Sequence, residues 1–390
     1  MIWKYIQFEG KLLLRNKLNW LLGVAFILFF SLYFFQYSAG DIESLRDRKS
    51  AEALEYNTIF NYFPEEMRDT PKGQEIYNNL TEQSSLINKQ RYSLWKNDDY
   101  EEYIEGGLKL NELRLRLYEL GNEGVHPEFI IPKEEIRKED ALLRYYQKNQ
   151  LPLEADPFAA SNYIPVALEK VDGLLFVLFV LFLGGNMLLH DQQKRSVMGI
   201  FPISFMQRVF VKTGLHFIQA LAFLLAGLLI GGWFVSIRTA WGNFKSPLLL
   251  FQNGDYVAVG TSRYILYMVV AMALLALLLL LLSILVNVIT KNMYATVLLI
   301  VVVFLAPMLL HFAGIDASWL QPLSVMEISQ VLSGDTAVQY GKDTIDYKWA
   351  FVWLAVLNVA VLLVLFGGNR VMYMKKHATP SYQVGKGGGN

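Results

Sequence analysis

The stretch RYILYMVVAMALLALLLLLLSILVNV, residues 263–288, contains no acidic residue and no lysine. Its one charged residue, Arg263, stands at the first position. A helix needs roughly 20 apolar residues to cross the hydrocarbon core of a bilayer, and this stretch is longer than that. It therefore indicates a transmembrane helix and a membrane protein.

Further apolar runs of similar length lie on both sides of this stretch. They cover residues 18–38, 171–190, 213–236, 293–312 and 349–367. The composition agrees, because 54% of the 390 residues are hydrophobic and only 18% are charged, a balance that is rare in a soluble domain. We predict an all-α polytopic membrane protein with six transmembrane helices.

Residues 1–17 have a pattern of their own. Lys4, Lys11 and Arg15 fall on one side of a helical wheel, and apolar residues cover the other sides. This pattern predicts an amphipathic helix that lies in the membrane interface; the alternative is a cytoplasmic tail that only sets orientation. A cleaved signal peptide is disfavoured, because the run at 18–38 exceeds the apolar core of about 7–15 residues typical of such peptides.

The distribution of cations indicates the orientation. Among the short segments, Lys and Arg gather before the first run, between the second and third, after the fourth and after the last. The positive-inside rule then places both termini in the cytoplasm, with residues 368–390 as a cytoplasmic tail. The absence of cysteine fits a bacterial envelope protein. We expect a multi-pass protein of the bacterial plasma membrane.

Residues 39–170 then form an external domain, and leucine spacing predicts that it is helical. Apolar residues recur at steps of three and four in one stretch and form a looser stripe in another, so each stripe lies on one helical face. We interpret the stripes as a core, with a peptide-binding groove as the alternative. They consist of Leu110, Leu113, Leu117 and Leu120, and of Ile76, Leu80, Ile87 and Leu94.

Motifs of catalysis are missing from the sequence. There is no H-E-x-x-H, no G-x-S-x-G and no G-x-x-x-x-G-K-[ST] phosphate loop, and the five histidines lack metal-ligand spacing. We expect no enzyme activity, no metal and no cofactor bound by this chain. Its formal net charge of zero gives no support for a nucleic-acid partner.

The six predicted spans hold no Asp, Glu, Lys or Arg in their cores, which argues against an ion-coupled carrier. Their polar residues are predicted to form interhelical hydrogen bonds. Gly227 and Gly231 form a small-xxx-small pair that permits close helix packing, and we expect this face to contribute to a dimer. The polar residues are His216, Gln219, Ser283, Asn287 and Asn358.

The connection at residues 190–212 is the most informative segment. It begins as the polar run HDQQKR, turns apolar, breaks at a proline and gains cations before the third run. An apolar tip on the inner side of the membrane would be covered by a groove on a soluble partner; the alternative is a loop packed on lipid headgroups. Its candidate partner-coupling residues are Asp191, Lys194, Arg195, Val197, Gly199, Ile200, Phe201, Pro202, Ser204, Arg208 and Lys212.

This segment resembles that of the type-2 ABC exporter permease family. There, an acidic residue at the end of the second span is followed by a glycine, a Pro-x-Ser turn, and Arg and Lys before the third span. The acid is more often Glu in the family. An interfacial N-terminal helix, six spans and a large external domain extend the resemblance over essentially the whole chain. The matching residues are Asp191, Gly199, Pro202, Ser204, Arg208 and Lys212.

The resemblance implies the membrane subunit of an ATP-driven exporter. Such a permease pairs with an identical or sister permease and with two cytoplasmic ATPase subunits, which bind ATP and Mg²⁺. The large external domain is similar to that of permeases for antimicrobial-peptide export and immunity, so the expected cargo is a peptide or amphiphile. The alternative is a sensing or immunity module that signals through its external domain without transport. A membrane-embedded enzyme is a third, weaker hypothesis.

Overall fold

The computed structural model describes residues 2–40, 42–96, 100–153, 156–188, 202–315 and 318–378 of the chain. Within these ranges, five helices are long and apolar enough to cross a membrane. The prediction of a mostly helical, multi-pass membrane protein is therefore confirmed. These helices are α2 (Lys17–Ser38), α13 (Phe205–Arg238), α14 (Thr261–Thr290), α15 (Met293–Phe312) and α18 (Tyr347–Ala378).

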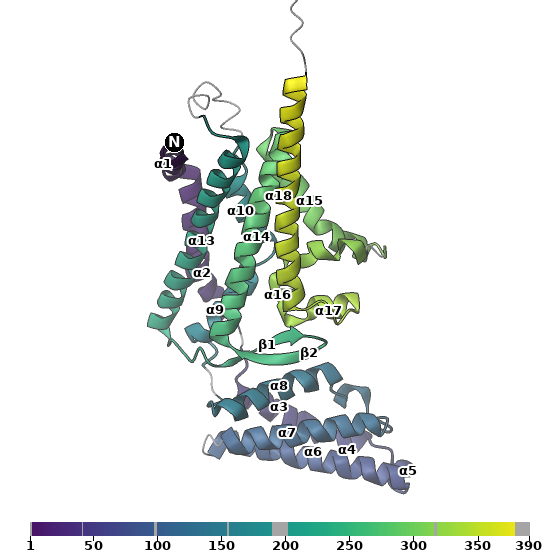
Figure 1. The fold of residues 1–390 in the computed structure, drawn as a ribbon. Coiled ribbons are helices and arrows are strands. Elements are labelled where there is room, and N and C mark those ends of the chain that lie inside the picture. The colour runs from purple at the N-terminus through teal and green to yellow at the C-terminus, as the bar shows by residue number, and fades with distance from the viewer. Residues whose placement is uncertain are drawn as a thin grey trace, which may run out of the picture.

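Shorter elements surround these spans. The N-terminal helix and the far end of α18 lie at one end of the spans, and helices α3 to α8 lie at the other end (Figure 1). The shorter helices are α1 (Ile2–Arg15), α3 (Leu45–Tyr56), α4 (Ile59–Tyr62), α5 (Glu65–Arg68), α6 (Pro71–Lys96), α7 (Tyr100–Glu119), η1 (Pro127–Phe129), α8 (Lys133–Asn149), α9 (Ala160–Val171), α10 (Leu174–Gly184), η2 (Ser318–Met326), α16 (Ile328–Ser333) and α17 (Asp335–Tyr340).

The predicted helix at 171–190 is interrupted in the structure. Helix α9 ends at Val171, and Gly173 has a φ of 78°, a conformation that a glycine adopts readily. Asp172 holds this break in place, because its carboxylate accepts a hydrogen bond from the backbone N–H of Ser329 at 2.6 Å. Helix α10 has 11 residues and a length of only about 16 Å, which is too short to cross a bilayer alone. The sixth span stays a prediction.

Helix α14 occupies the middle of the spanning bundle. It contacts α10, α13, α15 and α18, and it contributes buried side chains from Tyr264 to Ile284 to the largest apolar core. This central position explains why the longest apolar run of the sequence is also the span with the largest buried share. The other spans keep one face toward the surroundings, as lipid-facing helices do.

Three of the predicted polar residues join helices inside the bundle. The side-chain amide of Asn287 donates to the backbone oxygen of Gly185 at 2.7 Å. The amide of Asn358 donates to the backbone oxygen of Leu274 at 3.0 Å. Gln219 accepts a hydrogen bond from a side-chain amide of α2 at 3.2 Å. The prediction of interhelical hydrogen bonds is confirmed for these residues.

The two remaining polar residues behave differently. The Ser283 hydroxyl and Nδ1 of His216 are buried, and neither has a hydrogen-bond partner among the described residues. For these two residues the interhelical hydrogen bond stays a prediction.

The glycine pair packs inside the chain. A Cβ atom at Gly231 would lie 2.6 Å from Cβ of Phe30, and one at Gly227 would lie 2.6 Å from the Phe30 ring. Helices α2 and α13 thus approach each other closely along this face. Within the chain, Phe30 of α2 occupies this face, so the glycine pair serves packing of α2 on α13, and the dimer stays a prediction.

The helices at the far end have their own apolar core. Ile76, Leu80 and Ile87 of α6 and Leu110 and Leu117 of α7 are between 0 and 5% exposed. They belong to one cluster, with α6 and α7 packed side by side. The two apolar stripes therefore form a core, as predicted. Leu113 is only partly buried, and Leu94 belongs to a second cluster.

A β-hairpin that the sequence analysis did not predict connects α13 to α14. Strands β1 (Pro247–Gln252) and β2 (Asp255–Gly260) pair antiparallel around Asn253 and Gly254, which both have positive φ, the preferred turn of a two-residue hairpin. The hairpin packs against α8. The Tyr256 hydroxyl donates to the Glu134 carboxylate, and this hydrogen bond lowers the pKa of Glu134.

Candidate functional site

Part of the predicted coupling segment lies outside the described residues. Its described part begins at Pro202 and continues into the first turns of α13. This part also adjoins α1, so the site described below is the junction between α1 and the start of α13. The residues outside the described ranges are Asp191, Lys194, Arg195, Val197, Gly199, Ile200 and Phe201.

Ser204 defines where α13 begins. Its hydroxyl accepts a hydrogen bond from the backbone N–H of Gln207 at 3.3 Å, and the Gln207 side chain accepts one from the backbone N–H of Ser204 at 3.0 Å. This reciprocal capping box satisfies two N–H groups at the helix start. The helix therefore begins at Phe205, earlier than the predicted third span at 213–236, and it includes Arg208 and Lys212.

A buried ion pair links α1 to α13. The Lys212 ammonium lies 2.9 Å from a carboxylate oxygen of Glu9, and the two side chains are 4% and 9% exposed. Because removing charges from water is costly, loss of either partner would leave a buried charge without its counter-charge. Around this pair, Tyr5 of α1 and Val211 of α13 form a small apolar cluster. The pair and the cluster together fasten α1 to the start of α13.

The sequence analysis missed Glu9. A signal was present, because Glu9 is the only acidic residue among the first 17 residues, and it lies on the opposite side of the helical wheel from the three cations. In the structure Lys4, Lys11 and Arg15 are exposed, whereas Glu9 is buried. The exposed cations agree with a helix whose charged side faces water or lipid headgroups.

Asn16 separates α1 from α2. Its side-chain oxygen accepts a hydrogen bond from the backbone N–H of Leu18 at 3.1 Å and caps the first turn of α2. The predicted helix over residues 1–17 therefore ends at Arg15, and the chain changes direction before it enters the span. This corner brings Arg15 and Lys17 to the edge of a cavity.

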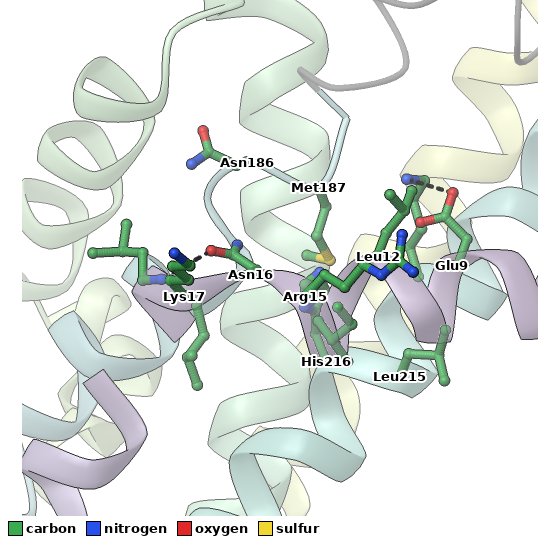
Figure 2. Close-up of a pocket in the computed structure, with 13 residues that line it drawn as sticks. Glu9, Leu12, Arg15, Asn16, Lys17, Asn186, Met187, Leu215 and His216 are labelled. Carbon is green, nitrogen blue, oxygen red and sulfur yellow. Dashed lines mark hydrogen bonds and ion pairs between the residues drawn. The ribbon is translucent and has the colours of Figure 1, made fainter. Parts of the chain in front are cut away.

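The cavity has a volume of about 450 Å³ and lies between α1, the start of α2, the end of α10 and α13. Figure 2 shows side chains from these elements converging around it. Arg15, Asn16, Lys17 and Asn186 are exposed at its rim. The rest of its lining consists of Glu9, Leu12, Leu13, Leu18, Leu183, Met187, Lys212, Leu215 and His216.

The other end of α13 is joined to the segment that returns from the far helices. The Thr239 hydroxyl donates to the backbone oxygen of Phe158 at 2.9 Å. The backbone N–H groups of Ala160 and Ser161 donate to the oxygens of Ala240 and Trp241 at 2.9 and 3.0 Å. Helix α13 thus connects the α1 junction at one end of the bundle with the start of α9 at the other (Figure 1).

The junction offers charge, hydrogen-bonding groups and apolar surface. No group of three or more His, Asp or Glu side chains among the described residues could hold a metal ion. Comparison with known proteins adds no identity, because no family model, no curated protein and no solved structure matches this chain.

Proposed function

We propose that the protein is the membrane subunit of an ATP-driven exporter of peptides or amphiphiles. The observation that carries this proposal is the continuous helix α13, which begins within the predicted coupling segment and ends at the return from the external helices. With 34 residues it is about 51 Å long. A helix of this length can transmit a displacement from one side of a membrane to the other.

The start of α13 is suited to receive such a displacement. In the proposed mechanism, the apolar tip at Val197, Ile200 and Phe201 lies in a groove of a cytoplasmic ATPase. The capping box at Ser204 makes the helix rigid from its first turn. Because the Glu9–Lys212 pair fastens α1 to the same turns, α1 moves together with α13.

The end of α13 is suited to pass the displacement on. Its hydrogen bonds to Phe158, Ala160 and Ser161 connect it to α9 and, through the chain before α9, to the external helices. A push at the inner end would therefore change the position of the external part relative to the bundle. A partner permease, identical or a sister, would complete a translocation path between the two bundles.

A sensing or immunity module is the second candidate, and the hairpin favours it. Tyr256 of the hairpin donates to Glu134 of α8, and Lys138 of α8 lies over the Tyr256 ring at 5.1 Å. A peptide bound by the external helices could thus act on β2 and on α14, which follows it directly. This route needs no cargo movement.

Co-purification tests the proposed ATPase contact. The tagged chain is purified from the membranes of its own host, and orthovanadate-sensitive ATP hydrolysis is measured. Burial of a Phe side chain contributes roughly 1.5–3 kcal/mol, so Phe201→Ala should weaken ATPase binding by about one to two orders of magnitude. Phe210→Ala is the matched control, because Phe210 is 50% exposed on α13 itself. The Phe210→Ala variant should retain the ATPase on purification.

Arg195→Glu and a flux assay separate the remaining outcomes. A partly exposed ion pair contributes roughly 0–1 kcal/mol, so Arg195→Glu should keep the ATPase but show weaker stimulation of hydrolysis by an amphipathic peptide. Inverted vesicles should take up a labelled amphipathic peptide only with ATP. ATPase binding without uptake would favour the sensing module. Normal ATPase binding and uptake in both Phe201→Ala and Arg195→Glu would refute the coupling role.

A further inference from the structure

The cavity at the α1–α2 corner carries an excess of positive charge. Arg15 and Lys17 stand at its rim, and neither lies within ion-pairing distance of a carboxylate in the described part of the chain. The one carboxylate in the lining, Glu9, is paired with Lys212. The charge of Glu9 is thus already compensated, and the two rim cations leave a field that attracts an anion.

Hydrogen-bonding groups face the same space. Nδ1 of His216 is buried and has no hydrogen-bond partner within the described ranges, although His216 lines the cavity. The side-chain amide of Asn186 is exposed at the rim. Helix α2 also begins here, so its dipole adds a partial positive charge. A ligand with acceptor oxygens would bond to the exposed Asn186 amide, whereas the buried Nδ1 of His216 lies out of its direct reach.

The remaining lining is apolar. Leu12 and Leu13 of α1, Leu18 of α2 and Leu215 of α13 border the cavity together with Leu183 and Met187. A small free anion would leave this apolar surface in contact with water. A ligand that carries hydrocarbon next to its anionic group would cover it. The combination therefore distinguishes an amphiphile from a soluble ion.

The position of the cavity matches this ligand. It lies where the amphipathic helix α1 meets the start of a spanning helix, which is the level of lipid headgroups in a bilayer. Basic pockets between spanning helices at this level suit phosphate headgroups. We propose that the cavity binds the phosphate headgroup of an anionic phospholipid, with Arg15 and Lys17 as its charge contacts. This proposal does not depend on an ATPase partner.

Native mass spectrometry of the purified full-length chain tests the proposal. The protein is exchanged into detergent with equal amounts of phosphatidylglycerol and phosphatidylcholine, and the lipid that stays bound is identified. Each cation beside an anionic headgroup strengthens binding roughly fivefold. The double variant Arg15→Gln/Lys17→Gln should therefore retain phosphatidylglycerol roughly 25-fold more weakly.

Two comparisons make the test specific. Lys4→Gln/Lys11→Gln removes the same charge from exposed positions of α1 that do not line the cavity, and it should retain phosphatidylglycerol like the unchanged chain. A large excess of inorganic phosphate should not displace the lipid, because phosphate cannot cover the apolar wall.

Three results would each overturn the proposal. If both double variants lost phosphatidylglycerol equally, the lipid would be attracted only to the overall positive charge of α1 and not to the cavity. Equal retention of phosphatidylcholine and phosphatidylglycerol would show no recognition of an anionic headgroup. Displacement by inorganic phosphate would identify a soluble anion as the ligand instead of a lipid.

Discussion

Glu9 of α1 and Lys212 of α13 form a buried ion pair, with 2.9 Å between the carboxylate oxygen and the ammonium nitrogen. The two residues are far apart in the sequence and belong to the short N-terminal helix and to a helix long enough to span a membrane. Their pairing means that α1 is part of the bundle instead of a separate element on its surface. It also positions Arg15 and Lys17 beside the cavity, since both follow Glu9 in the same corner of the chain.

The ion pair should contribute strongly to stability. Glu9→Gln leaves a buried ammonium without its carboxylate, and the loss of one partner of a buried pair costs about 3 kcal/mol. We expect the thermal unfolding midpoint of the purified protein to fall by several degrees. The double variant Glu9→Gln/Lys212→Met removes the buried ammonium as well and should recover much of this loss. Equal midpoints for the unchanged chain and Glu9→Gln would contradict the structural role.

Close packing of α2 on α13 should make one glycine intolerant of substitution. Gly231→Ala would place a Cβ atom 2.6 Å from Cβ of Phe30, so the two helices must separate and stability should fall by about 1–3 kcal/mol. Gly214→Ala is the control in the same helix, because no atom lies within 4 Å of its Cβ position. The thermal unfolding midpoints of the two variants, measured in detergent, give the comparison. A loss at Gly214 equal to that at Gly231 would refute the packing argument.

Helices α3 and α7 should lose stability in acid through Glu52. Burial alone would raise the pKa of Glu52, but Lys49 and Arg114 outweigh burial and lower it; Arg114 lies 2.5 Å from its carboxylate. A group with a lowered folded pKa stabilises the protein above its unfolded pKa, near the ordinary 4.5 of Glu. This contribution is lost as the pH falls through the lowered pKa.

Hydrogen exchange can measure this acid effect. Peptides from α3 and α7 should exchange faster as the pH falls below about 4.5, after correction for intrinsic rates. Glu52→Gln should flatten this dependence. As a control, Glu75→Gln removes a carboxylate from an exposed ion pair with Arg116. This variant should leave the pH dependence of exchange in α3 and α7 unchanged. The same pH profile in Glu52→Gln as in the unchanged chain would exclude Glu52 as its source.

Thiol labelling should establish the orientation. The chain has no cysteine, so single cysteines at Ser85 and Ser196 can be labelled without background. Ser85 is exposed on α6, at the end of the bundle opposite to α1. With a membrane-impermeant reagent on intact cells, Ser85→Cys should react and Ser196→Cys should not. The reverse pattern would invert the orientation predicted from the cations.

Several features of the fold follow from local sequence. Length and apolarity alone predict the spans, because a chain that crosses a bilayer must satisfy its backbone within one helix. The stripes of α6 and α7 are periodic, so the buried face can be read from spacing. The hairpin had a local signal as well, since Asn253-Gly254 between two apolar runs is a strong turn pattern. The turn pattern Asn253-Gly254 was not part of our prediction.

The break before α10 could not be read in this way. Residues 171–190 form an apolar run that resembles the other spans. Helix α10 covers only Leu174–Gly184, and at its start the Asp172 carboxylate accepts a hydrogen bond from the N–H of Ser329, which lies far along the chain. A run of apolar residues shows that a segment can enter a membrane, but it does not show which distant backbone group will compete for a side chain at its edge.

The sequence by itself determined which segments are apolar, which faces of α6 and α7 are buried and where the cations gather. These properties depend on residue type and on spacing within one segment. Only the tertiary structure decided that Glu9 pairs with Lys212, that Phe30 covers the glycine face of α13, and that Arg15 and Lys17 border a cavity. Each of these facts joins residues of different helices. Their distances depend on how the helices pack, and residue spacing along one helix does not contain that information.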